Sequence, residues 1–244
     1  MQNLSLPKQF NKDDKYEQVL EELANQYAEE VYNDQEPGSQ FMTPEVKKNK
    51  YKEEFKNSVR LEEFEKDLVQ AVSILINEGE RFLEKPEWEN LQNELINCKK
   101  TLAELSYEDD LPDVLYPSLG MSQRSLHAID SIARELYRLQ EYSKTASLNV
   151  FLITLDGTNA NYWYNLGMSL QDAGNYEKAI SAYACCRVLD PKNIGAYLFS
   201  AECYLTQGNK QEALLDLEDG ERLVEKLTDS TPWDSFITTL KECL

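Results

Sequence analysis

Few residues in this chain are of the types that carry out acid–base, redox or metal chemistry. Its 244 residues include a single histidine, His127, which removes most acid–base and metal schemes and is expected to be an exposed helix residue. The adjacent thiols Cys185 and Cys186 would point to different faces of a helix, so packing explains them better than redox chemistry. Asp109 and Asp110 lack a partner set for catalysis. The sequence therefore predicts no enzyme, no metal site and no cofactor.

The chain contains a 34-residue repeat, which predicts the helices that position its side chains. The unit 160–193 reads ANYWYNLGMSLQDAGNYEKAISAYACCRVLDPKN, and the unit 194–227 follows it without a gap. The first unit has large and small residues at the spacing that interlocks two antiparallel helices: Trp163, Leu166, Gly167, Leu170, Gly174, Ala179, Tyr183, Cys186 and Pro191. This spacing is the tetratricopeptide pattern.

A weaker copy of the repeat precedes these units, at 126–159. Its end, LDGTN, matches LDPKN in the next unit. Its first helix keeps the key residues of the pattern: Ile129, Ile132, Ala133 and Leu136. Thr145 and Asn149 depart from the pattern, and Gln140 stands where the other units have a turn glycine. We interpret it as a diverged repeat, which brings the number to the three that such an array normally needs.

A capping helix is expected after the last repeat, because Thr231-Pro232-Trp233-Asp234 has the residues of a helix start. Apolar residues then recur at helical spacing to Leu244. The predicted fold is all-α: a short solenoid of about three helical hairpins with a C-terminal capping helix, in a domain spanning 121–244.

The preceding region, 1–120, is predicted to be a separate acidic helical region. Helices are expected from 13 to 31, from Thr43 as far as Lys85, and from about Pro86 onwards. In the second of these, Leu61, Phe64, Leu68, Ala71 and Leu75 form a heptad-like apolar seam. The seam is open to two interpretations: packing within the chain, or a coiled-coil contact with a second chain.

The charge of the chain narrows the classes of partner. The formal net charge is −19, of which about two thirds lies in residues 1–120. Nucleic acid and anionic membrane surfaces are disfavoured because this field repels phosphate groups. No long apolar run predicts membrane insertion, and no basic, apolar start predicts export by the general secretory route. Five cysteines in helical patterns are typical of reduced thiols in a cytoplasm.

Binding is the function that remains. The first helix of each hairpin lines the concave face of such a solenoid, and positions 2, 5, 9 and 12 of the repeat point into it. These positions are His127, Asp130, Arg134 and Tyr137, then Asn161, Tyr164, Met168 and Gln171, then Gly195, Leu198, Glu202 and Leu205. Tyrosine brings area with a polar tip, and Met adapts its shape, so the groove suits an extended peptide with spaced apolar anchors. Packing of these residues against the chain's own N-terminal helices is the competing interpretation.

The region 126–244 resembles the class II chaperones of bacterial type III secretion, which guard translocator proteins. The resemblance is carried by three repeats followed by a C-terminal helix, and by the phrases QEYSKTA, LGMSLQDAGNYEKAISAYACCRVLD and SAECYLTQGNKQEALLDLEDGERLVEK. It implies a bacterial cytoplasmic protein that keeps a secretion substrate soluble. It also implies contacts of the client with Tyr137, Tyr142, Tyr164, Met168 and Leu198. Members usually have a short N-terminal dimerisation helix, so the long region here leaves a homodimer as one possibility.

Three functions compete at this point. The first is a chaperone that holds an extended segment of a secreted protein in the concave groove, through Arg134, Tyr137, Tyr142, Tyr164, Met168, Gln171, Leu198, Glu202 and Leu205. The second is a structural adaptor that joins components of a larger, secretion-related assembly. The third is a helper for a secretion needle subunit, which would hold a small helical client. A chaperone releases its partner, whereas an adaptor stays in the final complex.

Overall fold

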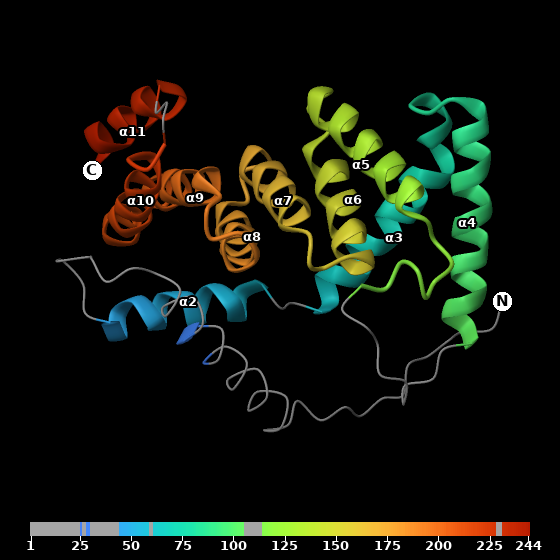
Figure 1. The fold of residues 1–244 in the computed structure, drawn as a ribbon, viewed down its shortest axis with the longest axis horizontal. Helices are drawn as coiled ribbons and strands as arrows, with labels where there is room; N and C mark the ends of the chain where they lie inside the picture. The colour runs from blue at the N-terminus through green and yellow to red at the C-terminus, as the bar shows by residue number, and fades with distance from the viewer. Residues whose placement is uncertain (1–24, 26–27, 30–43, 59–60, 105–113, 228–230) are drawn as a thin grey trace. The chain divides into compact units, whose positions relative to one another are not determined.

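The computed structural model describes residues 25, 28–29, 44–58, 61–104, 114–227 and 231–244, in two compact units. The first unit, Met1–Lys56, contains most of α2 (Pro44–Ser58). The second, Asn57–Leu244, contains the later helices (Figure 1). Among the described residues the only β pairing is a single bridge between Val114 and Asp156, so the all-α prediction is confirmed. The helix predicted over 13–31 lies almost wholly outside the described residues.

In the second unit, a pair of helices joined by a short turn precedes the repeats. α3 (Leu61–Asn77) is followed by the 3-10 turn η1 (Gly79–Arg81) and by α4 (Lys85–Glu104). The prediction of one helix as far as Lys85 is therefore wrong, because α3 already ends at Asn77. The reversal depends on Gly79, since a Cβ at this position would lie 2.5 Å from the ring of Trp88 on α4.

The predicted hairpins are present as three pairs of helices. They are α5 (Gln123–Arg138) with α6 (Tyr142–Leu155), α7 (Ala160–Asp172) with α8 (Tyr176–Leu189), and α9 (Ile194–Thr206) with α10 (Lys210–Val224). α11 (Thr231–Cys243) follows where the capping helix is predicted. The four cap side chains Ser122, Asn159, Asn175 and Asn193 each accept a hydrogen bond from a backbone N–H of the helix that they precede. Figure 1 shows the repeat helices following one another along the second unit.

The turn inside each hairpin has a left-handed residue at the same repeat position. Gly174 has a φ of 78° and Gly208 a φ of 80°. Gln140 adopts the same conformation, with a φ of 62°, although it carries a Cβ that disfavours it. The diverged first repeat therefore keeps the turn geometry of the others.

The seam of α3 contributes to the core of the second unit. Leu68, Ala71 and Leu75 share one apolar cluster with residues of α4, α5, α6 and α7, and α3 packs along α6. The hydroxyl of Ser147 on α6 also donates a hydrogen bond to the Asp67 carboxylate, at 3.0 Å. For these residues of the seam, packing within the chain is what the structure shows. The first two seam residues, Leu61 and Phe64, have side chains outside the described set.

A buried ion pair joins the second helices of adjacent hairpins. Arg187 on α8 donates to the Asp216 carboxylate on α10 at 3.1 Å, and both side chains are 1% exposed. The guanidinium also lies 5.2 Å from the ring centroid of Tyr197 on α9. The pair thus links α8 directly to α10, and its guanidinium also contacts α9.

Candidate functional site

The candidate site is a pocket of about 540 Å3 in the first two repeats. α5 supplies one wall and α7 the other, and two residues of α6 join them. The lining residues are Asp130, Ala133, Arg134, Tyr137, Arg138, Thr145, Asn149, Asn161, Tyr164, Asn165, Met168 and Ser169. Of the residues predicted to bind a peptide, the structure brings Arg134, Tyr137, Tyr164 and Met168 together around this pocket. Their role in binding stays a prediction.

The α5 wall carries charges that are paired within the helix. One guanidinium nitrogen of Arg134 lies 2.7 Å from a carboxylate oxygen of Asp130, and the Arg134 side chain is 71% exposed. Arg138 pairs with Glu135 at 3.0 Å. These arginines therefore form a polar rim in which part of the positive charge is already balanced.

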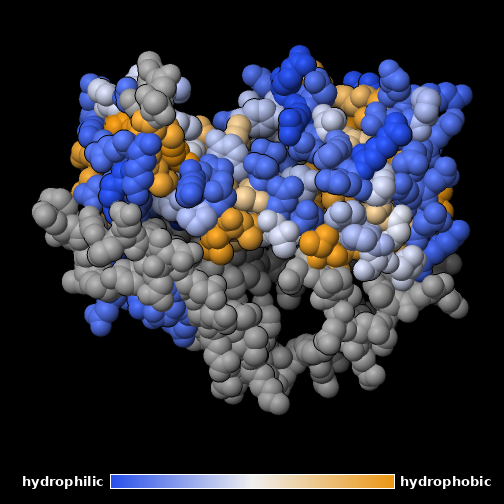
Figure 2. All heavy atoms as spheres, viewed as in Figure 1, coloured by the Kyte–Doolittle hydropathy of each residue, from blue (hydrophilic) through white to orange (hydrophobic). Residues whose placement is uncertain are grey.

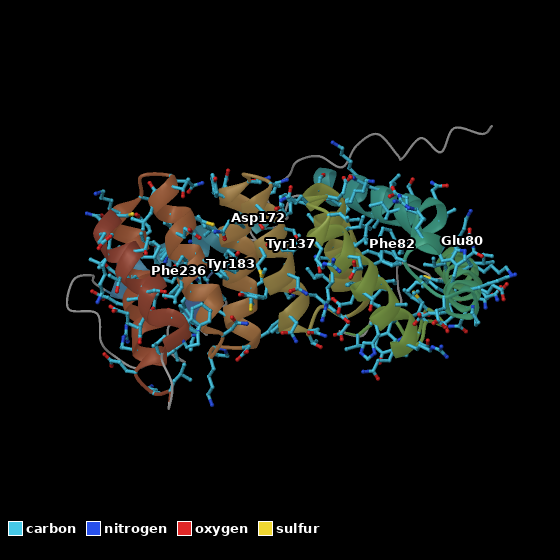
Figure 3. The ribbon with its side chains drawn as sticks, turned by 90° about the horizontal axis from the view of Figure 1, so that it is seen from above. Glu80, Phe82, Tyr137, Asp172, Tyr183 and Phe236 are labelled. Carbon is cyan, nitrogen blue, oxygen red and sulfur yellow. The ribbon has the colours of Figure 1, made fainter. Side chains whose placement is uncertain are left out.

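Tyr137 connects the two walls. Its hydroxyl donates a hydrogen bond to the carboxylate of Asp172 on α7, and Figure 3 shows the two labelled residues side by side. Burial and this carboxylate raise the pKa of Tyr137, so the phenol stays protonated and remains a donor. The ring also meets that of Tyr142 on α6 edge to face, with centroids 5.4 Å apart. Tyr142 is thus beside the pocket, behind Tyr137, and is not one of its lining residues.

Tyr164 is held by an aromatic group that continues into the third repeat. Its ring centroid lies 6.0 Å from that of Tyr183 and 6.1 Å from that of Phe199. Gly195 allows this position, because a Cβ there would lie 2.5 Å from the Tyr164 hydroxyl oxygen. Burial raises the pKa of Tyr164 to about 12. The ring is therefore neutral and held by its neighbours, and it lines the pocket.

The part of the predicted groove over α9 is covered. Leu198 is 0% exposed and packs with Leu217, Val224, Ile237 and Leu240, which belong to α10 and α11. Phe199 contacts the rings of Trp233 and Phe236 on α11, with centroids 6.3 and 5.4 Å apart. Leu198 is therefore buried under α10 and α11 and is not exposed as the sequence analysis expects, and its role in binding stays a prediction. Leu205 is half-buried and packs into the same cluster.

Gln171 and Glu202 bind each other. The Gln171 amide nitrogen donates to the Glu202 carboxylate at 2.6 Å, while its carbonyl oxygen accepts from the Tyr183 hydroxyl at 2.7 Å. This chain of hydrogen bonds links α7, α8 and α9 beside the aromatic group. Gln171 and Glu202 therefore form a polar boundary between the pocket and the segment of α9 that α11 covers.

Sequence reasoning missed the polar floor of the pocket. Thr145 and Asn149 of α6 are almost completely buried, at 3% and 1% exposed, yet both line it. The sequence did mark Thr145 and Asn149, because both depart from the repeat pattern. A departure from the pattern does not by itself show that a residue lines a pocket.

Other features of the described residues offer no competing chemistry. Burial raises the pKa values of the Cys186 and Cys203 thiols to about 12, so both stay protonated. No group of His, Cys, Asp and Glu among these residues is arranged to hold a metal ion. None of the described helices is long and apolar enough to cross a membrane.

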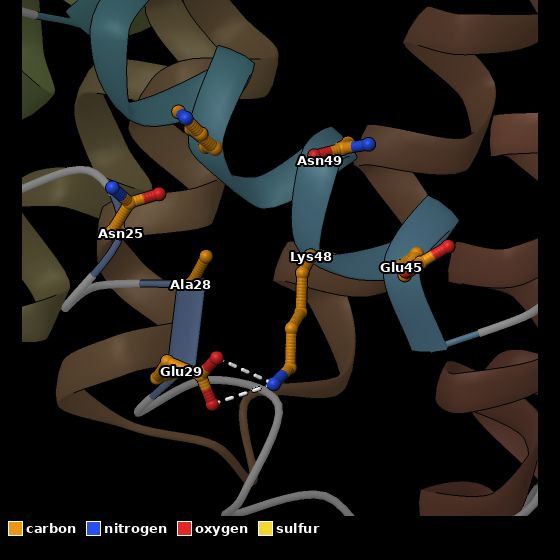
Figure 4. A pocket seen from close by; sticks show the side chains of 7 residues that line it. Asn25, Ala28, Glu29, Glu45, Lys48 and Asn49 are labelled. Carbon is orange, nitrogen blue, oxygen red and sulfur yellow. Dashed lines mark hydrogen bonds and ion pairs between the residues drawn. The ribbon is translucent and has the colours of Figure 1, made fainter. Parts of the chain in front are cut away.

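A smaller hollow of about 270 Å3 lies in the first unit, beside α2 (Figure 4). Its main feature is an ion pair in which the Lys48 ammonium donates to both carboxylate oxygens of Glu29, at 2.5 and 2.6 Å. These charges satisfy each other, and the side chains are 30% and 54% exposed. The hollow is therefore a weaker candidate than the pocket between α5 and α7.

Comparison with known proteins agrees with this architecture. Residues 160–193 match the family model of the tetratricopeptide repeat. Low calcium response locus protein H of Yersinia pestis is 24% identical over 124 residues, which are 51% of this chain and 74% of that protein. A chain of the CopN–Scc3 complex has the same fold over 61% of this chain and 98% of its own length, with a TM-score of 0.53 and 18% identity.

A chaperone is also among the similar structures. It is the Yersinia enterocolitica type III secretion chaperone SycD, in complex with a peptide of the translocator YopD. It covers 50% of this chain and 92% of its own, with 25% identity and a TM-score of 0.48. Residues 160–193 are thus a tetratricopeptide repeat, as the sequence predicts.

Proposed function

We propose that the chain is a chaperone, without enzymatic activity, that holds an extended segment of a secreted protein in the cytoplasm before export. The observation that carries this proposal is the open pocket between α5 and α7, which gathers Tyr137, Tyr164 and Met168 around a polar floor. Pockets of a few hundred Å3 with an apolar wall and a few fixed polar groups are typical ligand sites. The likeness of sequence to a low calcium response protein supports the same class of function.

The physical task of such a chaperone is to cover apolar surface of the client. Tyr164 is preorganised by its aromatic neighbours, so little conformational entropy is lost when a peptide packs on it. Met168 is unbranched and adapts to different partners. Binding lowers the concentration of free, aggregation-prone client by mass action, and a moderate affinity permits release for export.

The other residues that the sequence predicts to bind the client differ in how close they lie to the pocket. Arg134 at the rim orients polar groups of the client, and Tyr142 supports Tyr137 from behind. Gln171, Glu202 and Leu205 border the pocket on the α9 side. Leu198 is given no direct contact with the client in this proposal, since it is 0% exposed and packs with residues of α10 and α11.

Co-purification from the native host tests the chaperone against the adaptor. We expect one secreted protein to be recovered with the chain, to aggregate when the chain is removed, and to leave it on export. Tyr164→Ala is expected to weaken the complex by about 1–3 kcal/mol. A partner that stays bound in the final assembly, together with unchanged affinity in the Tyr164 variant, would favour the adaptor.

Native mass spectrometry of the same material gives the stoichiometry and tests for a homodimer.

A further inference from the structure

The first and second repeats differ in one side chain of their second helix. This side chain faces the first helix of its own repeat and the first helix of the next repeat. In the second repeat it is Tyr183 of α8, which is 0% exposed. Its ring lies against Gly167, where a Cβ would overlap it, and its centroid is 6.0 Å from that of Tyr164 and 6.2 Å from that of Phe199. Its hydroxyl donates to Gln171. One aromatic side chain with a donating tip thus completes this repeat (Figure 3).

The same repeat position in the first hairpin holds Asn149, which is much shorter. The residues that correspond to the neighbours of Tyr183, each 34 positions earlier, are Ala133, Asp130, Tyr137 and Asn165. All four line the pocket between α5 and α7, together with Asn149. The pocket therefore occupies the place that the second repeat fills with its own tyrosine.

Two residues that line the pocket, Asn149 and Asp130, each have a buried side-chain oxygen without a hydrogen-bond partner. The Asn149 amide nitrogen donates to the Thr145 carbonyl at 3.0 Å, which orients the amide and leaves its carbonyl oxygen with no hydrogen-bond partner. One oxygen of Asp130 pairs with Arg134, and its other oxygen is buried without a hydrogen-bond partner. Unsatisfied buried acceptors are unfavourable, so a ligand that brings a donor to them gains more than an apolar one.

We propose that the client supplies the missing aromatic side chain, and that the preferred residue is tyrosine. This inference rests on the proposed function and names what the pocket selects. The ring packs between Ala133 and the Tyr164–Met168 wall, in the manner of Tyr183 one repeat later. The hydroxyl donates its one hydrogen bond to one of these two acceptors. An ammonium group is disfavoured because Arg134 and Arg138 stand at the rim and because the Asp130 carboxylate is already paired with Arg134.

A library of random dodecapeptides displayed on phage provides the probe. Selection on the wild-type chain is expected to enrich tyrosine at one fixed position, and synthetic versions of the selected peptides are then titrated by calorimetry. Replacing that tyrosine by alanine is expected to weaken binding about 30-fold. Replacing it by phenylalanine, which removes only the hydroxyl, is expected to weaken binding about 3- to 10-fold.

The variant Asn149→Tyr restores the self-filled arrangement of the second repeat and is expected to lower peptide affinity at least about 10-fold. Ser143→Tyr, on the exposed part of the same helix, is the matched control and is expected to bind normally. Asn149→Leu removes one of the two acceptors and is expected to reduce the preference for tyrosine over phenylalanine, and it keeps the test valid if the tyrosine variant does not fold.

The possible outcomes separate this inference from the function on which it rests. Peptides that lose affinity in Tyr164→Ala but bind Asn149→Tyr as tightly as the wild type would overturn the inference and leave the chaperone proposal standing. Enrichment of lysine or of aliphatic residues at the fixed position would also overturn it. If the folded chain enriches no peptide, both proposals fail.

Discussion

At the scale of single residues, the diverged first repeat shows which departures are tolerated and which change the surface. Gln140 takes the left-handed conformation that glycine provides in the other two turns, so the hairpin geometry is kept at a cost in backbone strain. Asn149 replaces a large side chain and opens a pocket. The sequence identifies Gln140 and Asn149 as departures from the repeat pattern. Only the structure shows that Gln140 keeps the turn geometry, whereas Asn149 lines a pocket.

Gln140→Gly is expected to stabilise the chain by roughly 0.5–1 kcal/mol, because glycine adopts a positive φ without the steric cost of a Cβ. Thermal or urea unfolding of the two proteins measures the difference. Gly174→Gln is the matched reverse substitution and is expected to destabilise. Equal or lower stability of Gln140→Gly would show that the turn is not strained.

Glu94 gives the fold an acid-sensitive contact. Burial raises its pKa, but hydrogen bonds from Ser125, Ser122 and Asn90 together outweigh burial, so the pKa lies below its ordinary value of 4.5. The folded state therefore binds fewer protons than the unfolded state just below that pH. The stabilisation by Glu94 is present above the unfolded pKa and is lost as the pH falls through the folded one. Unfolding of Glu94→Gln is expected to depend less steeply on pH below about 4.5 than that of the wild type.

At the scale of elements, the sequence predicted the repeats well because each small residue has a partner only one helix away. Gly167 against Tyr183 is an example. The sequence did not predict where the helix expected as far as Lys85 stops. The close contact between Gly79 and Trp88, which lies in the turn after this helix, does not recur in the sequence as the repeat contacts do. The sequence also did not predict the burial of Leu198, since a rule for inner-face positions does not say which repeat the capping helix covers. Figure 2 shows a large apolar patch over these C-terminal helices, on a surface that is mostly hydrophilic.

The ion pair between α8 and α10 is expected to behave as a buried pair. Arg187→Met leaves the Asp216 carboxylate buried without its cation, at a cost of about 3–5 kcal/mol. The double variant Arg187→Met with Asp216→Leu removes both charges and is expected to recover most of that loss. Denaturant unfolding of the three variants measures the coupling between the two sites. Additive losses would show that the two charges act independently.

At the scale of the whole molecule, the acidic N-terminal region and the repeats are joined through α3 and α4, which share a core with α5 and α6. The domain boundary predicted near residue 120 remains a prediction about independent folding. The acidic excess of residues 1–120 is expected to disfavour binding of nucleic acid.

Two truncations test how the units depend on each other. Removing residues 1–56 takes away only the first compact unit and is expected to leave the melting temperature of the remainder nearly unchanged. Removing residues 1–120 also takes α3 away from α6, so we expect a melting temperature lower by several degrees. Equal melting temperatures for both truncations would show that residues 121–244 fold as an independent domain.

The central claim, that a client lies in the pocket between α5 and α7, is tested most directly by photo-cross-linking in the native host. A benzophenone amino acid is placed at Met168, which lines the pocket, and separately at Ser143, which is exposed on α6 away from it. We expect Met168 to cross-link to one continuous segment of a secreted protein, and Ser143 to give none. Cross-links to that protein from Ser143 but not from Met168 would contradict the account.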